Sequence, residues 1–213
     1  MEVDGFTSTL TLQLHFDKSL ITPKVPAQDK YYSVRVRTHL LGIYCANNSK
    51  IYCFFHDETT GTMGPNKVIS LLDYLIQRLQ NEHGRHDHLI IWSDKAPGKF
   101  KECFLFFYLD YIVQPGQFLR VNFKFLLEGH TYSVCDTRFG TIQTLFKKWE
   151  IIAIPQHNLS NVEVCWVTLA MVKDFNSFLR LRYVSWNEDI EKQRFEGKKH
   201  CMAQFQLRRK RGQ

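Results

Sequence analysis

Apolar and polar residues alternate in several segments of the first quarter of the chain. In residues 10–16, four large apolar side chains alternate with polar ones, which is the period of a strand with one buried face. Residues 31–44 and 51–55 continue the alternation on either side of a turn-like Asn-Asn-Ser, as in a β-hairpin. The pattern predicts three strands. Between the first two, residues 20–26 are predicted to form a loop, because two prolines disfavour helix and central strand.

Helical spacing replaces this alternation further along the chain. Apolar residues recur three and four positions apart in residues 68–79, which predicts a helix capped by Asn66 and ended by Gly84. Residues 101–113 and 133–146 predict two further helices. The inward positions of the last helix are expected to be Phe139, Ile142, Leu145 and Phe146.

Two apolar segments separate these helices. Residues 89–92 are apolar on both faces, as in a buried parallel strand, and residues 119–127 predict a fifth strand. The order strand, strand, strand, helix, strand, helix, strand, helix predicts an α/β fold with a mixed five-stranded sheet flanked by helices, spanning residues 1–149.

The pattern changes after Trp149. Residues 162–171 are largely apolar, and residues 174–181 permit a short helix, so residues 150–213 are interpreted as a small C-terminal extension packed on the core. The extension ends in a basic tail, Leu207-Arg208-Arg209-Lys210-Arg211. This tail is either a nuclear-import signal or phosphate contact, or a solvated terminus.

Charge and cysteine content narrow the class of protein. The 213 residues carry a net charge of +7, which favours a polyanionic partner such as DNA or RNA. The six cysteines form no Cys-x-x-Cys pair, as expected of reduced thiols in an intracellular protein. No run approaches the roughly 20 apolar residues of a membrane helix, so no membrane partner is expected.

Acidic residues follow three of the predicted strands. Asp17 follows the first strand, Asp94 follows the fourth, and Asp136 comes after the fifth. Carboxylates gathered at strand ends are typical of proteins that hold divalent metals against phosphodiesters. The alternative is structural: Asp17 and Asp94 are ordinary turn residues, and Asp136 is an acid of a helix first turn paired with Arg138.

Local sequence adds to the order of elements. The residues concerned are Asp17-Lys18-Ser19-Leu20-Ile21-Thr22-Pro23-Lys24, Tyr31-Tyr32, Asp57-Glu58, Ser93-Asp94, and Gly129-His130 with Asp136 and Phe139. They resemble an uncharacterised ribonuclease-H-like domain family of transposon-derived eukaryotic proteins, similar in fold to retroviral integrases, ribonucleases H and transposases. The resemblance covers residues 10–178.

The resemblance implies a catalytic site. In such a sheet the first and fourth strands are parallel neighbours, so Asp17, Asp94 and Asp136 would be the catalytic acids and the ligands of Mg²⁺ or Mn²⁺. Glu58 would be an accessory ligand, and His130 would orient a carboxylate or contact a phosphate. Both also have a purely structural interpretation.

The chain departs from the family pattern beside Asp94. Lys95 and Lys99 stand where the family carries polar uncharged residues. A lysine close to a carboxylate competes with a metal, yet the same lysines can bind nucleic acid. Two functions follow: a nuclease or strand-transfer core of ancestral type whose activity the lysines oppose, or a non-catalytic nuclear module that binds nucleic acid or protein.

Two further patterns carry weaker signals. His83, His86 and His88 fit no established zinc spacing and are interpreted as a solvated loop. Residues 120–125 interleave basic and aromatic side chains, which suits base stacking on an exposed face, although Phe123 and Phe125 favour the core.

Overall fold

The computed structural model describes residues 8–16, 20–22, 36–57, 60, 64–93, 103–126, 134–148, 160–183 and 205–208. The chain divides into two compact units. The first comprises Met1–Leu12, Gly64–Gly129 and Ala170–Gln213, and the second comprises Gln13–Met63 and His130–Leu169. Strand β1 (Thr9–Phe16) therefore contributes its beginning to the first unit and its end to the second.

The described residues of the second unit form a sheet and the helix α3. Its strands follow the order β7–β4–β3–β1, and β2 pairs with β3. Strands β3 and β4 form an antiparallel hairpin, β2 is antiparallel to β3, and β7 is parallel to β4. The elements besides β1 are β2 (Leu20–Thr22), β3 (Val36–Cys45), β4 (Lys50–Asp57), α3 (Val134–Lys148) and β7 (Val162–Trp166).

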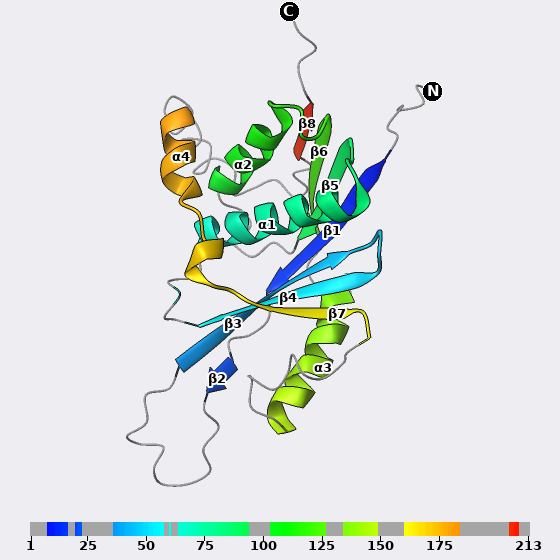
Figure 1. Cartoon of the computed structure of the whole chain (residues 1–213), viewed down its shortest axis with the longest axis vertical. Helices are drawn as coiled ribbons and strands as arrows, with labels where there is room; N and C mark the ends of the chain where they lie inside the picture. Colours follow the sequence, from blue (N-terminus) through cyan, green and yellow to red (C-terminus); the bar gives the residue numbers. More distant parts are fainter. Residues whose placement is uncertain are drawn as a thin grey trace, which may run out of the picture. The chain divides into compact units, whose positions relative to one another are not determined.

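Helix α3 packs on one face of this sheet (Figure 1). Phe139 and Ile142 are buried, as the helical spacing predicts, and Cys135 lies with them. Their cluster includes the strand residues Leu40, Ile51, Cys53 and Phe55. An apolar stripe on α3 therefore packs against the alternate, apolar positions of β3 and β4.

In its described residues, the first unit combines strands with three α-helices (Figure 1). Its strands follow the order β1–β5–β6–β8, with β5 and β6 parallel and β8 antiparallel to β6. Its elements besides β1 are α1 (Pro65–His83), β5 (His88–Ser93), α2 (Cys103–Val113), β6 (Arg120–Phe125), α4 (Phe175–Arg182) and β8 (Phe205–Arg208). A short 3₁₀ helix, η4 (Leu169–Met171), precedes α4.

Strands β1 and β5 begin side by side. The Ser8 carbonyl accepts hydrogen bonds from the backbone N–H groups of Asp87 and His88, at 3.1 and 3.2 Å. Because both contacts join the starts of the strands, β1 and β5 run in the same direction within this unit. The first and fourth strands of the predicted order are thus parallel neighbours.

Helix α1 begins differently from the prediction. Its N-cap is Gly64 and Pro65 opens its first turn, which suits a proline because the first N–H groups of a helix need no helical partner. The Asn66 side chain instead accepts a hydrogen bond from the Asn176 N–H at 3.1 Å. Asn66 therefore joins the start of α1 to the first turn of α4 rather than capping α1.

The observed elements match the predicted order and add three strands to it. All five predicted strands and all three predicted helices are present in an α/β fold with mixed strand pairing. The predicted loop at residues 20–26 is wrong in its first part, because residues 20–22 form β2 before the first proline.

The described part of the predicted extension is shared between the units. Strand β7 pairs with β4 in the second unit, whereas α4 and β8 belong to the first. The expected boundary between residues 149 and 150 lies outside the described residues. The basic tail begins inside β8, since Leu207 and Arg208 pair with β6.

Candidate functional site

Asp136 is the one predicted site residue that the structure describes. The other six lie outside the described residues: Asp17, Glu58, Asp94, Lys95, Lys99 and His130. Asp136 occupies the first turn of α3, where the positive end of the helix dipole favours a carboxylate. Its side chain is 42% exposed, so solvent and ions reach it.

The carboxylate of Asp136 is held by a histidine of β1. His15 Nε2 lies 2.9 Å from Asp136 Oδ1, a hydrogen bond when the imidazole is neutral and an ion pair when it is protonated. The sequence suggested Arg138 as the partner of this acid. The contact instead joins α3 to the strand that immediately precedes Asp17.

Two further contacts fix this junction in the second unit. The His15 ring lies 5.6 Å from the Phe139 ring, centroid to centroid, with the planes inclined by 34°. Cys135 Sγ lies 3.7 Å from the Gln13 carbonyl oxygen, a weak thiol hydrogen bond. Gln13 and His15 are two residues apart on one face of β1, and that face receives the first two turns of α3.

A glycine of β3 sets how closely α3 approaches the sheet. A Cβ atom built on Gly42 would lie 2.5 Å from Phe139 Cζ and 3.3 Å from Ile51 Cδ1. Carbon atoms in contact normally lie about 3.5–4.0 Å apart. The missing side chain of Gly42 therefore creates the space for Phe139, and Phe139 in turn places the helix that carries Asp136.

The chemistry of this junction follows from its two polar side chains. Imidazole nitrogen and carboxylate oxygen are both ligands of divalent transition metals, and the carboxylate alone suits Mg²⁺. Within the described ranges, no group of three or more His, Cys, Asp or Glu side chains is arranged to hold a metal ion. What these residues form is a His–Asp pair at the end of β1.

Sequence reasoning did not single out His15. The signal available was its place on the polar face of β1, two positions before Asp17. That alternation identifies a side chain on the same face as Gln13, but not which helix covers it. The partner of His15 follows from the docking of α3, which depends on contacts far apart in the sequence.

The first unit contains a separate buried polar network. Asp73 of α1 is 5% exposed, lies 2.7 Å from Lys173 Nζ, and accepts hydrogen bonds from Tyr108 Oη at 3.1 Å and Gln77 Nε2 at 2.8 Å. Burial and the neighbouring carboxylate raise the pKa of Tyr108 well above its ordinary value, so its hydroxyl stays a donor. These contacts join α1, α2 and the segment before α4, which is a structural role.

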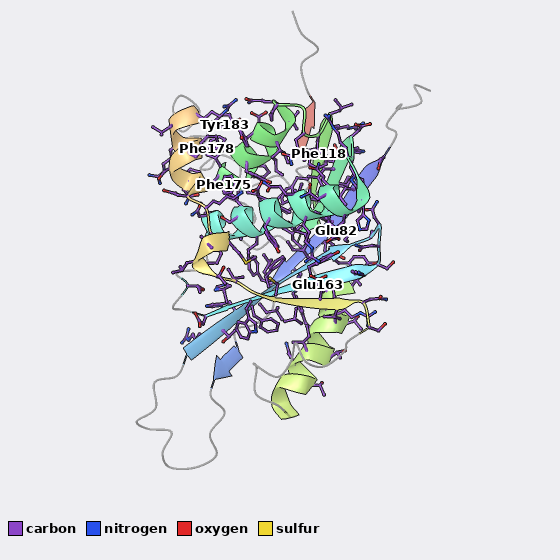
Figure 2. All side chains as sticks on the ribbon, viewed as in Figure 1. Glu82, Phe118, Glu163, Phe175, Phe178 and Tyr183 are labelled. Atoms are coloured by element: carbon purple, nitrogen blue, oxygen red, sulfur yellow. The ribbon has the colours of Figure 1, made fainter. Side chains whose placement is uncertain are left out.

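Aromatic contacts complete the attachment of α4. Figure 2 shows Phe175, Phe178 and Tyr183 on the side of α4 that faces α2. Tyr183 stacks on Phe107 at 4.9 Å, and its hydroxyl donates to Asp110 at 2.6 Å. Burial and this hydrogen bond raise the pKa of Tyr183.

The histidines after α1 are not a uniformly solvated loop. His83 is exposed, but His86 and His88 are 6% and 8% exposed. Burial lowers the pKa of His86 below its ordinary value of 6.5. The expectation of three solvated histidines is therefore wrong for two of them.

The sequence matches a family model over residues 28–211, described as Domain of unknown function (DUF7869). The chain belongs to the DUF7869 family. The match includes Asp136 and every described element from β3 to β8, whereas β1 and His15 precede it. No curated protein and no solved structure matches the chain.

Among the described helices of the DUF7869 chain, none combines the length and the apolar character needed to cross a bilayer.

Proposed function

We propose that this DUF7869 chain is a transposon-derived ribonuclease-H-like domain, whose ancestral activity is metal-dependent phosphodiester cleavage or strand transfer. Asp17, Asp94 and Asp136 are its proposed catalytic acids, with Glu58 as an accessory ligand. The substrate class is DNA or RNA, in keeping with the net charge of +7.

The position of β1 carries this proposal. Strand β1 neighbours β3 in the second unit and β5 in the first. Around it, β3 and β4 are antiparallel, and β5 and β6 are parallel strands connected through α2. In the predicted order β1 and β5 are the first and fourth strands, and the ribonuclease-H-like resemblance implies that these two strands are parallel neighbours.

The contact between His15 and Asp136 gives further support. It brings Asp136 of α3 to the end of β1, two residues before Asp17. In a strand, residues two apart share a face, so His15 and Asp17 would share one if the strand period continued. Two of the three proposed acids would then be neighbours in the second unit.

The side chains of Asp136 and His15 are chemically suited to bind a divalent ion. Asp136 offers a partly exposed oxygen ligand, and His15 adds a nitrogen that suits Mn²⁺ better than Mg²⁺. When bound, such an ion activates water and stabilises charge on a phosphodiester. His15 would compete with the ion for Asp136 when protonated, and would orient the carboxylate when neutral.

Metal titration tests the proposal. Isothermal titration with Mn²⁺ and Mg²⁺ should give binding at millimolar concentrations or below, weakened about tenfold or more by Asp94→Asn and by Asp136→Asn. Glu163→Gln, which removes the same charge from β7 of the second unit (Figure 2), is the matched control and should bind as the parent does. Absence of divalent-ion binding would refute the metal site.

The second function, a non-catalytic nuclear module that binds nucleic acid or protein, is favoured by the same histidine. An imidazole beside Asp136 provides a partner for the carboxylate without a metal. This function predicts nucleic-acid affinity that falls with salt and survives Asp94→Asn. Loss of that affinity in Asp94→Asn would count against it.

A further inference from the structure

Strands β5 and β6 of the first unit have one largely buried face and one face on which partly exposed residues alternate with the buried His88 and Asn122. On the buried face lie Leu89, Ile91, Ser93, Val121 and Phe123. Phe123 packs edge-on against Phe106 of α2, with ring centroids 5.7 Å apart. The sequence predicted burial on both faces of β5, but Ile90 and Trp92 on its other face are partly exposed.

The partly exposed face carries a tryptophan beside a lysine. Trp92 and Lys124 are register partners on neighbouring strands, and Lys124 Nζ lies 4.9 Å from the centre of the Trp92 ring. Arg120 lies on the same face of β6 as Lys124, and its Nε is 3.3 Å from Asn122 Oδ1. In residues 120–125, Phe123 therefore lies on the buried face, and Arg120 and Lys124 lie on the other face.

Strand β8 pairs with β6 on the side away from β5. In the β6–β8 register, Arg208 is the partner of Arg120. Arg120 and Lys124 are four residues apart on one strand, or roughly 13 Å. Cations and an aromatic ring on neighbouring strands are the side chains that contact phosphates and a stacked base in single-strand binding sites.

We propose that the Trp92 surface, formed by Trp92, Arg120 and Lys124, binds single-stranded nucleic acid. A base stacks on Trp92, and Lys124 moves from the ring to a phosphate while Arg120 contacts a second phosphate. Stacking on aromatic side chains of a sheet needs unpaired bases, which favours a single strand over a duplex. The proposal rests on the nucleic-acid partner of the proposed function and adds where that partner binds.

Charge argues for this occupant over an apolar protein segment. The surface contains one large aromatic ring, with Lys124 beside it and Arg120 four residues further along the neighbouring strand, and the whole chain carries a net charge of +7. Single-strand binding sites combine this kind of cationic track with stacking rings. A protein partner is the outcome indicated if oligonucleotides fail to bind.

Fluorescence anisotropy with labelled single-stranded DNA and RNA tests the proposal. The titration is done in EDTA, so that no metal contributes. Trp92→Leu keeps an apolar side chain but removes the stacking ring, and should weaken binding about tenfold or more. Lys124→Ala should weaken binding and reduce the slope of log K against log salt by about 0.7.

Lys50→Ala is the matched charge control. Lys50 is an exposed residue at the start of β4 and is not one of the three residues of the Trp92 surface, so this change removes one positive charge without altering that surface. Its affinity and salt slope should stay at the parent values. Equal losses in Lys50→Ala and Lys124→Ala, or unchanged affinity in Trp92→Leu, would overturn the proposal.

The two proposals fail separately. Binding in EDTA that needs Trp92 stands even if no divalent ion binds at the acids. Conversely, metal binding that needs Asp94 stands even if Trp92→Leu binds oligonucleotides normally. Circular dichroism melts of each variant check folding, and Trp92→Phe, which keeps a stacking ring, should recover most of the affinity that Trp92→Leu loses. Failure of that recovery would assign the loss to altered packing and overturn the stacking role.

Discussion

Substitution of Gly42 by alanine tests how α3 is seated. A Cβ atom at this position would lie 2.5 and 2.6 Å from Cζ and Cε1 of Phe139, so the ring would have to retreat by roughly 1 Å to reach normal contact. Phe139 is 2% exposed inside its cluster, which leaves little room for that movement. Overpacking of this kind costs about 1–3 kcal/mol.

An opposing term reduces the net effect. Alanine gains roughly 0.5–1 kcal/mol over glycine within a strand, because it loses less backbone entropy on folding. Gly42→Ala should therefore lower the free energy of unfolding by about 1 kcal/mol, within a range of roughly 0–2.5 kcal/mol, and the melting temperature by about 2–4 °C for each kcal/mol. Urea unfolding followed by circular dichroism measures the first quantity, and a thermal melt measures the second.

Two companion variants make the test specific. A Cβ atom on Gly140, an exposed glycine of α3, meets no atom within 4 Å, so Gly140→Ala should stabilise by about 0.5–1 kcal/mol. Phe139→Leu shortens the obstructing ring, so combining it with Gly42→Ala should cost less than the sum of the two single changes. If Gly42→Ala is as stabilising as Gly140→Ala, the close approach of Phe139 is refuted.

The remaining predictions concern the first unit. Asp73→Ala should lower the free energy of unfolding by about 2–3 kcal/mol, because it leaves the buried Tyr108 hydroxyl without this acceptor; the contribution of Lys173 is small, since its side chain is 53% exposed. Asp73→Asn keeps an acceptor and should cost less; equal costs would contradict this. His86 has a lowered pKa in the folded state, so the unfolded chain binds the proton more readily, and stability should fall as pH decreases below about 6.5. The free energy of unfolding of His86→Gln, measured above and below that pH, should decrease less than that of the parent protein. An equal decrease would contradict His86 as the titrating group.

Periodicity was sufficient to predict most of the elements. The alternation in residues 10–16 and the helical spacing in residues 68–79 correspond to β1 and α1, because burial of one face imposes these periods on the sequence. Strands β7 and β8 could not be assigned partners in the same way. The pairs between β4 and β7 join residues 111 positions apart (162 − 51), and the pairs between β6 and β8 join residues more than eighty positions apart. No local pattern encodes that choice of partner.

The candidate site shows the same limit. Asp136 could be predicted as an acid at the start of a helix, from its place before an apolar helical pattern. Its contact with His15 could not, because it depends on Phe139 filling the space above Gly42. The local sequence around Asp136 contains no information on which strand the helix meets. It therefore suggested Arg138, the nearest cation along the chain, as the partner.

The attachment of α4 has a consequence for how the chain folds during synthesis. Ser70 and Lys173 exchange hydrogen bonds across 103 positions, and Phe107 of α2 stacks on Tyr183. At about 5–20 residues per second, a ribosome adds the 70 residues from Val113 to Tyr183 (183 − 113) in roughly 4–14 s. Throughout that interval the aromatic residues of α2 lack their contacts with α4 and Tyr183, so the nascent chain exposes them to chaperones until residue 183 has been synthesised.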